Sequence, residues 1–362
     1  MISKVAIFLP SLDGGGAERV MLNLARNFVE QDIKVDLVLA KAEGPYLSQV
    51  PSEVRLVSLG DGKLLLSLPA LMRYLHMEKP QAMFCGENDA NIVALWARQL
   101  SRVSTQIVIT VHNHLSRESR NSPQLKRRLT PYLARWFYPQ ADAIVAVSQG
   151  VAEDLVRIGL PSDKIKVIYN PIFTPALLEK AQQPLAHPWF SSNQPPVILG
   201  VGRLEKQKDF PTLIRAFAQV QQQRPFRLII LGEGPQRSQL EALVQEMGLM
   251  ANVDMPGFVV NPYAYMNQSA VCVLSSAWEG FGNVLVEAMA TGTPVVSTNC
   301  ESGPAEILAN GQYGKLVAVG DVEGMAEAIA NTLNNPPNSQ TLRQRAMEFS
   351  QERALAKYLE VL

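Results

Sequence analysis

The stretch Val271–Ser297, which reads VCVLSSAWEGFGNVLVEAMATGTPVVS, decides the fold of this chain. It opens with a short apolar run at Val271–Leu274 and passes through a glycine-containing loop into a segment with a helical pattern. It closes with a second apolar run at Val295–Ser297. Short apolar runs separated by helices are typical of parallel strands that are buried on both faces. The stretch therefore predicts a strand–helix–strand unit of a parallel α/β sheet.

The same alternation of apolar strands and helical patterns extends in both directions along the chain. A helix is predicted at Ala17–Val29, and the last stretch, Arg343–Leu362, also has a helical pattern. The other predicted strands are Val5–Leu9, Val35–Leu39, Ala82–Cys85, Ile107–Val111, Ala143–Val147, Val197–Val201 and Arg227–Leu231. The strands fall into two series, which predicts two doubly wound parallel sheets in tandem.

A proline-rich stretch divides the two series. Residues 171–196 contain six prolines, and we expect them to form an interdomain linker. A length of 362 residues also favours two domains. The expected parts are an N-terminal Rossmann-like domain at 1–170, a C-terminal one at 197–345, and a C-terminal helical segment at 346–362. Because open parallel sheets bind ligands at the carboxyl ends of their strands, we expect the chemistry in a cleft between the domains.

The composition narrows the class of protein and its partners. Hydrophobic residues make up 47% and charged residues 18%, as in an ordinary globular protein. The net charge is zero, with about +4 on residues 1–175 and −4 on the rest, so no overall field attracts nucleic acid. The three cysteines lack metal-ligand spacing, which predicts a reducing compartment. No apolar run approaches the roughly 18 residues of a membrane span, and the N-terminus does not read as a signal peptide. We expect a cytoplasmic protein whose membrane contact, if any, is peripheral.

A glycine-rich turn, DGGGAER at Asp13–Arg19, follows the first predicted strand and opens the first helix. Glycines there let backbone amides approach a ligand, and the start of a helix favours an anion. The turn lacks the full G-x-G-x-x-G pattern, so a plain tight turn is the alternative. The candidate binding residues are Gly14, Gly15, Gly16 and Glu18.

Two cations follow the predicted strand at Val197–Val201. Arg203 offers a planar fork and Lys208 a point charge on one strand-to-helix loop. That combination suits a diphosphate. Solvated loop charges are the alternative when this motif is taken alone.

The loop Ser276–Asn283 carries the most specific signal. Asn283 is predicted to cap the next helix, so the amides after Gly280 would face a ligand at the helix start. Glu279 lies in the loop, and Glu287 lies one turn beyond Asn283 on the same face. Carboxylates accept hydrogen bonds from hydroxyl groups, as sugars and ribose offer. The pair at a glycine-rich helix entry therefore indicates a ligand site rather than two solvated charges.

With these motifs the chain resembles family 4 of the retaining glycosyltransferases, also called glycosyl transferases group 1, over essentially its whole length. The strongest element is the Glu-x7-Glu pattern of EGFGNVLVEAMATGTPVV. GVGRLEKQKDFPTLIRAF matches the family's phosphate-binding Arg and Lys, although Asp209 stands where Gly is common. GGGAERV, TVHN, VSQGVAEDL, KIKVIYNP and FSQERALAKYLEVL match further segments. The resemblance implies the GT-B fold, an α/β architecture of two Rossmann-like doubly wound domains that face a central cleft, with the last helix crossing back to the first domain.

The resemblance also implies a role for each candidate residue. Arg203 and Lys208 would hold the diphosphate of a nucleotide-sugar donor, Glu287 the ribose, and Glu279 the transferred sugar. Backbone amides would come from Gly280, Phe281, Gly282 and Asn283, and Phe258 and Val259 would border the base. Gly14, Gly15, Gly16 and Glu18 would form the acceptor-side loop. His112 would stand at the donor–acceptor junction, with His114 as the alternative if the register is shifted. The implied catalytic residues are Glu279, His112, Arg203 and Lys208.

The activity that follows is retaining transfer of a hexosyl or N-acetylhexosaminyl group from a nucleotide diphosphate sugar. Uridine diphosphate is the first choice by family frequency, and the acceptor would be a sugar or a lipid-linked glycan of cell-surface polysaccharide or glycolipid synthesis. No cofactor and no metal are expected, because Arg203, Lys208 and helix amides can stabilise the leaving diphosphate. For retention, a same-face route in which the departing phosphate oxygen takes the acceptor proton fits better than a double displacement through Glu279.

A basic run lies beside aromatic residues in the first domain. The cations are Arg117, Arg120, Lys126, Arg127, Arg128 and Arg135, and the aromatics are Trp136, Phe137 and Tyr138. Such a helix can dock on an anionic membrane, which would place the protein at the inner face of the cytoplasmic membrane. A solvated helix with its aromatics in the core is the alternative.

Three other activities use similar architectures, because a fold does not fix a function. An NAD-dependent oxidoreductase would need G-x-G-x-x-G and an acidic residue at the end of the next strand, and neither is clear. A sugar-nucleotide epimerase would consume the nucleotide sugar without an acceptor. A non-catalytic sensor would not need Glu279, Glu287, Arg203 and Lys208 together.

Overall fold

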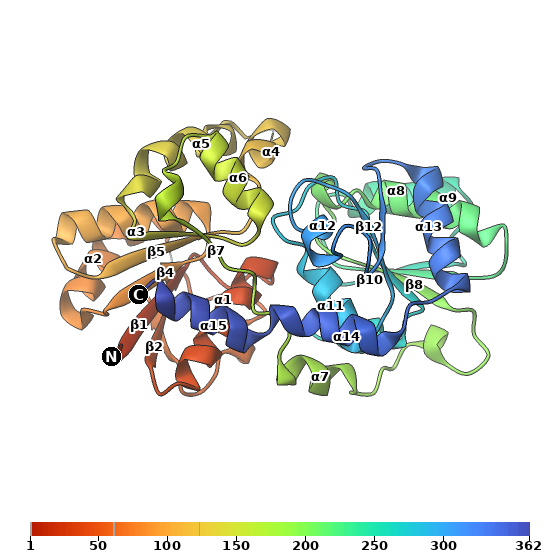
Figure 1. The fold of residues 1–362 in the computed structure, drawn as a ribbon, viewed down its shortest axis with the longest axis horizontal. Helices are drawn as coiled ribbons and strands as arrows, with labels where there is room; N and C mark the ends of the chain where they lie inside the picture. The colour runs from red at the N-terminus through yellow and green to blue at the C-terminus, as the bar shows by residue number, and fades with distance from the viewer. Residues whose placement is uncertain (1, 61, 123) are drawn as a thin grey trace. The chain divides into compact units, whose positions relative to one another are not determined.

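The computed structural model describes residues 2–60, 62–122 and 124–362. The chain forms two compact units (Figure 1). The first holds residues up to Pro171 together with Gln351–Leu362, and the second holds Ile172–Ser350. Each unit has its own parallel sheet with helices on both faces (Figure 1), so the prediction of two doubly wound α/β units is confirmed.

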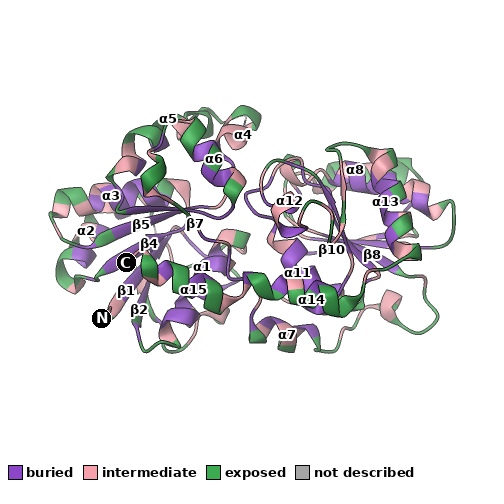
Figure 2. Cartoon of the chain, viewed as in Figure 1, coloured by how far each residue is buried: buried purple, intermediate pink, exposed green. Residues whose placement is uncertain are grey.

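The first unit contains a seven-stranded parallel sheet in the order β3-β2-β1-β4-β5-β6-β7. Its inner strands are almost fully buried, whereas the edge strands β3 and β7 are partly exposed (Figure 2). Burial on both faces explains why the inner strands are continuous apolar runs. The strands are β1 (Lys4–Leu9), β2 (Lys34–Leu39), β3 (Arg55–Ser58), β4 (Ala82–Cys85), β5 (Gln106–Val111), β6 (Ala143–Ala146) and β7 (Ile165–Val167).

Helices α1, α3 and α6 bury apolar faces against this sheet. The C-terminal helix α15 packs against α1, and the ring of its Tyr358 meets Phe84 of β4 edge-on with centroids 5.7 Å apart. The helices are α1 (Gly16–Val29), α2 (Leu68–Glu78), α3 (Asn88–Ser101), α4 (Leu115–Asn121), α5 (Leu125–Phe137), α6 (Gln149–Arg157) and α15 (Gln351–Glu360).

The second unit contains a six-stranded parallel sheet in the order β10-β9-β8-β11-β12-β13. One side of its core lies between this sheet and helices α8 and α13, where Phe210, Phe217 and Phe226 are buried. The strands are β8 (Val197–Val201), β9 (Arg227–Leu231), β10 (Val253–Gly257), β11 (Val271–Leu274), β12 (Val295–Thr298) and β13 (Lys315–Val317). The helices are α7 (Pro175–Ala181), α8 (Phe210–Gln221), α9 (Arg237–Glu246), α10 (Pro262–Gln268), α11 (Asn283–Thr291), α12 (Pro304–Ile307), α13 (Val322–Asn334) and α14 (Ser339–Ala346).

The proline-rich stretch 171–196, expected as a linker, differs in the structure because almost all of it belongs to the second unit. Pro175 stands in the first turn of α7, where proline is tolerated. Leu177 and Ala181 of that helix are buried, and the helix packs against α10 and α11. Pro175 therefore marks the start of a packed helix rather than a free connection.

The C-terminal segment is not the single helix that the pattern at Arg343–Leu362 predicts. Between α14 and α15 lies a 3₁₀ turn at Met347–Phe349. The carbonyl of Phe349 accepts hydrogen bonds from the backbone N–H groups of Ile172 and Phe173, over 3.0 and 3.1 Å. This carbonyl is therefore used by another part of the chain, and the helix stops there.

Candidate active site

The strand order creates a topological switch point in the second unit. Strand β8 has β9 on one side and β11 on the other, so the loops that follow β8 and β11 lead to opposite sides. Open α/β sheets bind their ligands at such a point, beyond the carboxyl ends of the strands. Lys208 follows β8 and Glu279 follows β11, so two predicted site residues lie at the switch point.

Lys208 and Glu279 are in direct contact there. Nζ of Lys208 lies 2.5 Å from Oε1 of Glu279, and only 19% and 8% of the two side chains are exposed. The hydroxyl of Ser276 donates a second hydrogen bond to the same oxygen over 2.6 Å. The carboxylate therefore has a fixed orientation, and its charge is compensated by a nearly buried ammonium.

Three hydrogen bonds tie the two loops to each other. The backbone carbonyl of Gln207 accepts a hydrogen bond from the N–H of Ala277 over 2.7 Å. The side-chain Nε2 of Gln207 donates a hydrogen bond to the carbonyl of Trp278 over 2.9 Å. The hydroxyl of Ser275 donates to the carbonyl of Lys208 over 2.7 Å. The second unit alone therefore sets the positions of Lys208 and Glu279. Sequence reasoning missed the supporting serines and Gln207, because a lone polar residue beside a motif has no pattern of its own.

The loop after β8 depends on close backbone approaches. A Cβ at Gly232 would lie 2.0 Å from the carbonyl oxygen of Gly202. Asp209 stands where glycine is common in the resembling family, and its φ of +43° and ψ of 46° lie in the left-handed region. Aspartate tolerates that region better than most residues do, and its carboxylate accepts a hydrogen bond from the hydroxyl of Thr212 over 2.7 Å. Burial raises the pKa of Asp209, although the Thr212 bond opposes this.

Glycine rather than asparagine caps α11. Gly282 is the N-cap with a φ of +98°, and Asn283 is the first helical residue, so the prediction of Asn283 as cap is wrong. The left-handed backbone needed here favours glycine. The side chain of Phe281 is buried and meets the ring of Phe349 edge-on at 5.4 Å, so only its backbone is available to a ligand. Gly303 comes so near that a Cβ would lie 1.8 Å from the carbonyl oxygen of Phe281.

The remaining predicted donor residues lie around this centre. Arg203 is exposed directly after β8. Phe258, of which 39% is exposed, and Val259 follow β10 at the same edge of the sheet. Glu287 is buried in the second turn of α11. The structure joins Lys208 and Glu279 directly, whereas these other residues share with them the carboxyl edge or the helix that starts there.

In the first unit, the glycine-rich turn follows β1. Strand β1 has β2 on one side and β4 on the other, so the turn lies at the switch point of this sheet. Gly14 has a φ of +94°, Gly15 caps α1, and Gly16 is its first residue. Glu18 is buried in the first turn of α1, the end of a helix that favours negative charge. The turn therefore has the geometry of a ligand loop of the first unit.

His112 follows β5 and is held by a hydrogen-bond relay. The hydroxyl of Thr110 donates to the carbonyl of Cys85 over 2.7 Å and lies 2.9 Å from Nε2 of His112. A hydroxyl carries one proton, so Thr110 accepts from Nε2–H, and we assign the free lone pair of the neutral ring to Nδ1. Burial lowers the pKa of His112 to about 4. Near pH 7 the ring is therefore neutral and offers an acceptor atom.

His114, the alternative to His112, has a structural position. It is buried and caps α4, and its Nδ1 lies 3.2 Å from Oδ2 of Asp154. The same carboxylate oxygen accepts the backbone N–H of Ser116 over 3.1 Å. His114 is thus occupied in fixing the start of α4, which favours His112 as the functional candidate.

Comparison with known proteins identifies the family of each half. Residues 14–174 match the family described as Glycosyltransferase Family 4, and residues 185–349 match Glycosyl transferases group 1. Over 345 residues the chain is 30% identical to the N-acetylgalactosamine-N,N'-diacetylbacillosaminyl-diphospho-undecaprenol 4-alpha-N-acetylgalactosaminyltransferase of Campylobacter jejuni, covering 92% of this chain and 91% of that protein. This chain belongs to glycosyltransferase family 4. It is also 24% identical over 342 residues to the lipopolysaccharide 1,6-galactosyltransferase of Escherichia coli, with 90% and 88% of the two chains covered.

Solved structures show the same fold for this glycosyltransferase. HepE from Anabaena, in complex with UDP-glucose, matches with a TM-score of 0.81 and 23% identity, over 99% of this chain and all of that one. The apo form of the lipopolysaccharide outer core galactosyltransferase WaaB matches with a TM-score of 0.71 and 21% identity, over 99% and 98% of the two chains. The GT-B fold of two Rossmann-like domains is therefore confirmed. The chain is a glycosyltransferase of glycan synthesis, and the oxidoreductase and epimerase alternatives are set aside.

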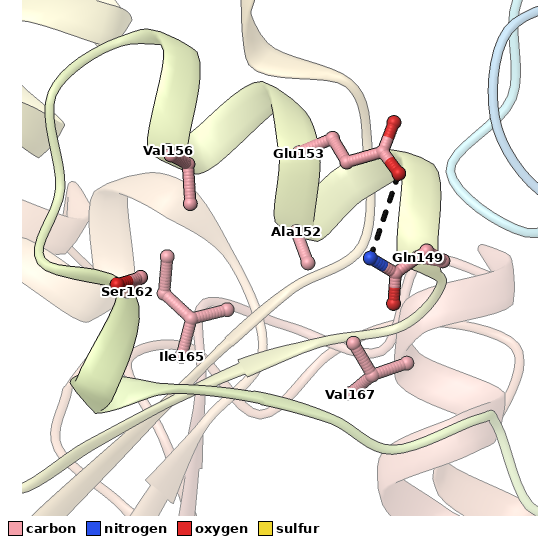
Figure 3. Close-up of a pocket in the computed structure, with 7 residues that line it drawn as sticks. All are labelled: Gln149, Ala152, Glu153, Val156, Ser162, Ile165 and Val167. Atoms are coloured by element: carbon pink, nitrogen blue, oxygen red, sulfur yellow. Dashed lines mark hydrogen bonds between the residues drawn. The ribbon is translucent and has the colours of Figure 1, made fainter.

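The glycosyltransferase also has a shallow pocket within its first unit, between α6 and β7 (Figure 3). Nε2 of Gln149 lies 3.5 Å from Oε1 of Glu153 at its rim. None of the predicted donor or acceptor residues lines this pocket, so it is not part of the site described above. Its lining is Gln149, Ala152, Glu153, Val156, Ser162, Ile165 and Val167.

Two searches of the described residues bear on metals and membranes. In residues 2–60, 62–122 and 124–362, no group of three or more His, Cys, Asp or Glu is arranged to hold a metal ion. Within the same ranges, none of the helices combines the length and apolar character that crossing a bilayer requires. The metal-free reaction and the cytoplasmic location stay predictions.

Proposed function

We propose that the protein is a retaining glycosyltransferase that moves a hexosyl or N-acetylhexosaminyl group from a UDP-sugar to a sugar or lipid-linked glycan. The product would enter cell-surface polysaccharide or glycolipid synthesis. The observation that carries the proposal is the Lys208–Glu279 pair at the β8–β11 switch point. In a family 4 chain, Lys208 would serve as the cation for a leaving diphosphate, and the Glu279 carboxylate beside it would hold the hydroxyls of a sugar.

The donor would be held by complementary charge. Lys208 has three N–H groups and Glu279 engages one, which leaves donors for phosphate oxygens. Exposed Arg203 adds a bidentate fork. Glu287 would accept the ribose hydroxyls, and Phe258 and Val259 would border the base. The complex of HepE with UDP-glucose supports uridine diphosphate as the nucleotide.

The reaction is proposed to need no metal, because positive charge at the leaving diphosphate comes from Arg203, Lys208 and the backbone amides between Gly280 and Asn283. Preorganised donors of this kind are each worth about 10²–10³ in rate. Turnover should therefore be unchanged after dialysis against EDTA. A loss of activity that Mg²⁺ or Mn²⁺ restores would reject this part of the proposal.

Retention is proposed to follow the same-face route, in which the departing phosphate oxygen takes the acceptor proton. Oε1 of Glu279 already binds the Lys208 ammonium and the Ser276 hydroxyl, which makes this carboxylate a better positioning group than a nucleophile. Proton NMR of the first product would show the anomeric configuration of the donor retained. Trapping a glycosyl-Glu279 intermediate by mass spectrometry would overturn this route.

The first unit is proposed to bind the acceptor. The glycine-rich turn at Gly14–Gly16, with Glu18 behind it, offers backbone amides and a carboxylate, and Nδ1 of His112 would accept a hydrogen bond from a sugar or acceptor hydroxyl. The printed name of the Campylobacter jejuni relative describes transfer to an undecaprenol-diphosphate-linked sugar. A lipid-linked acceptor would place this enzyme in the cytoplasm, at the inner face of the cytoplasmic membrane.

The decisive experiment is a thermal-shift screen of nucleoside diphosphates and sugar nucleotides, followed by a transfer assay on lipid-linked sugars. A ligand present at 100 times its Kd stabilises the folded state by about 2.7 kcal/mol. We expect UDP and one UDP-sugar to raise Tm, and Lys208→Met to remove that shift. If no nucleotide raises Tm and no sugar is transferred, the proposal fails.

A further inference from the structure

Helix α5 turns its apolar stripe towards solvent. Leu125, Leu129, Tyr132 and Trp136 recur at the spacing of one helix face, and 69%, 45%, 68% and 78% of these residues are exposed. Figure 2 shows α5 largely in the colour of exposed residues. A surface helix of a globular protein ordinarily directs such a stripe to the core. The exposed stripe is therefore a candidate docking surface.

The opposite side of α5 attaches the helix to its domain. Ala134 is its buried residue, and the ring of Phe137 meets Trp96 of α3 edge-on with centroids 5.4 Å apart. Tyr138, just beyond the helix, is also buried. The alternative that all three aromatics of the basic run lie in the core is therefore wrong for Trp136. The helix is anchored by its inner face and by its end, and its apolar outer face is left free.

Cations flank the exposed stripe. At 100° per residue, Lys126 falls on one side of the stripe, and Arg128 and Arg135 fall on the other. All three are exposed. Lys126 pairs with Asp89 over 2.7 Å at the surface, a type of pair that contributes little energy. In the part of the chain that the structure describes, Arg128 and Arg135 have no carboxylate within ion-pair distance.

We infer that α5 docks flat on an anionic phospholipid bilayer, with Trp136, Tyr132, Leu129 and Leu125 among the acyl chains and the cations at the headgroups. Three features favour a bilayer over a protein partner. The apolar stripe is narrow, and on one side it is flanked by Arg128 and Arg135, whose charges no carboxylate of the described residues compensates, which complements an anionic surface. Tyr and Trp prefer the membrane–water interface. The 13 residues of α5 extend about 20 Å, enough for an interfacial helix but too short to cross a bilayer. The inference rests on the proposed function only for the reason why docking would be useful, which is that a lipid-linked acceptor would lie at the membrane surface.

Vesicle flotation of the full chain tests the inference directly. Vesicles of phosphatidylcholine with about 30% phosphatidylglycerol should bind the protein in about 50 mM NaCl and release most of it in about 500 mM, because salt screens the headgroup charge. Tyr132→Ser/Trp136→Ser should lower the partition coefficient at least about ten-fold through lost apolar burial. Lys126→Gln/Arg128→Gln should lower it by about five-fold for each charge removed.

Matched controls use residues of equal exposure elsewhere. Met250, in the second unit, is 69% exposed, and Lys315 is exposed on β13. Met250→Ser and Lys315→Gln should leave vesicle binding unchanged. Since all of these side chains are exposed, each variant should keep the wild-type Tm, and circular dichroism would detect any that does not fold.

Tryptophan quenching locates the contact within the molecule. Of the four tryptophans, Trp136 is the one the structure exposes to 78%, while Trp96, Trp189 and Trp278 are partly buried. Brominated phospholipids should quench wild-type fluorescence, and Trp136→Phe should abolish the quenching while retaining vesicle binding. Quenching that persists in Trp136→Phe would show that another face docks.

The inference is overturned if wild-type protein ignores anionic vesicles, or if the Tyr132/Trp136 double variant binds them as well as wild type does. It is also overturned if sedimentation shows a dimer that the double variant dissociates, because a second copy of the chain would then cover α5. Transfer to a soluble acceptor sugar keeps this test separate from the proposed function. A docking-deficient variant should retain that activity, whereas an inactive protein that still binds vesicles would refute the transferase proposal and leave the docking intact.

Discussion

The substitution Lys208→Met separates the two tasks that we assign to the ion pair at the switch point. Methionine keeps the length of the side chain and removes its charge, so Glu279, with 8% of its side chain exposed, would keep Ser276 as its remaining partner on Oε1. Removing one partner of a buried ion pair costs about 3–5 kcal/mol. Because 19% of Lys208 is exposed and the Ser276 bond remains, we expect the lower end, about 3 kcal/mol. For a unit of this size that corresponds to a Tm lower by about 6–12 °C.

Turnover should fall by at least about 100-fold in the same variant, because a preorganised cation at the leaving group is lost. Lys206→Met is the matched control, since Lys206 is exposed in the same 3₁₀ turn as Lys208. It should change both stability and turnover little. Urea unfolding gives the free energy of unfolding, and release of the nucleoside diphosphate during transfer gives the turnover.

The double variant Lys208→Met/Glu279→Gln decides whether the reasoning is right. Glutamine can still accept the hydrogen bond from Ser276 and leaves no buried charge, so stability should return to within about 1 kcal/mol of wild type. Turnover should stay low, because neither charge is present. The reasoning is refuted if Lys208→Met keeps wild-type turnover, or if the double variant is as unstable as the single one.

Three further outcomes follow from the same structure. Because burial raises the pKa of Asp209, the folded state binds the proton more tightly, and wild type loses stability as the pH rises through that pKa. The effect of Asp209→Asn on the free energy of unfolding should therefore be more favourable at pH 7 than at pH 4, as urea unfolding at both pH values would show. Gly303→Ala puts a Cβ 1.8 Å from a backbone carbonyl oxygen and should prevent normal folding of the second unit. The control is Gly320→Ala, because Gly320 has a similar φ of +77° but no atom within 4 Å of the added Cβ. Thermal denaturation should show that the control loses only about 1–2 kcal/mol of stability. Because the pKa of His112 falls to about 4, wild type should lose stability as the pH falls from 6.5 towards 4, and His112→Asn should lose less.

The sequence predicted the inner strands well and the edge strands poorly, for one physical reason. Four of the inner strands, β4, β8, β9 and β11, have the predicted bounds, because burial on both faces leaves a continuous apolar run. The edges β3, β10 and β13 were not predicted as strands, and β7 was reached only through a family segment. An edge strand has one covered side and can carry polar residues, as RLVS of β3 and KLV of β13 do. Its identity comes from its neighbour in the sheet, and a local pattern does not contain that information.

The candidate site shows a similar division. Lys208 and Glu279 could each be named from their loops, but not their 2.5 Å contact across 71 positions of sequence. That contact depends on the strand order that places β8 next to β11. The cap of α11 was misassigned to Asn283 because asparagine is a good cap in general. The cap position requires a φ of +98°, which Gly282 adopts. This backbone angle is visible in the structure but cannot be read from the residue types.

In the proposed function, one lysine serves both stability and donor binding. A carboxylate beside a bound diphosphate would repel it, so Glu279 can contribute to a sugar site only while a cation screens it. Lys208 provides that screening with one of its three N–H donors, and in the proposed function the others bind phosphate oxygens. Lys206, exposed in the same turn, lies outside this contact and has no such pairing in the described residues. In the proposed function, the position of Lys208 between β8 and β11, more than its charge alone, therefore suits the switch point to a sugar diphosphate.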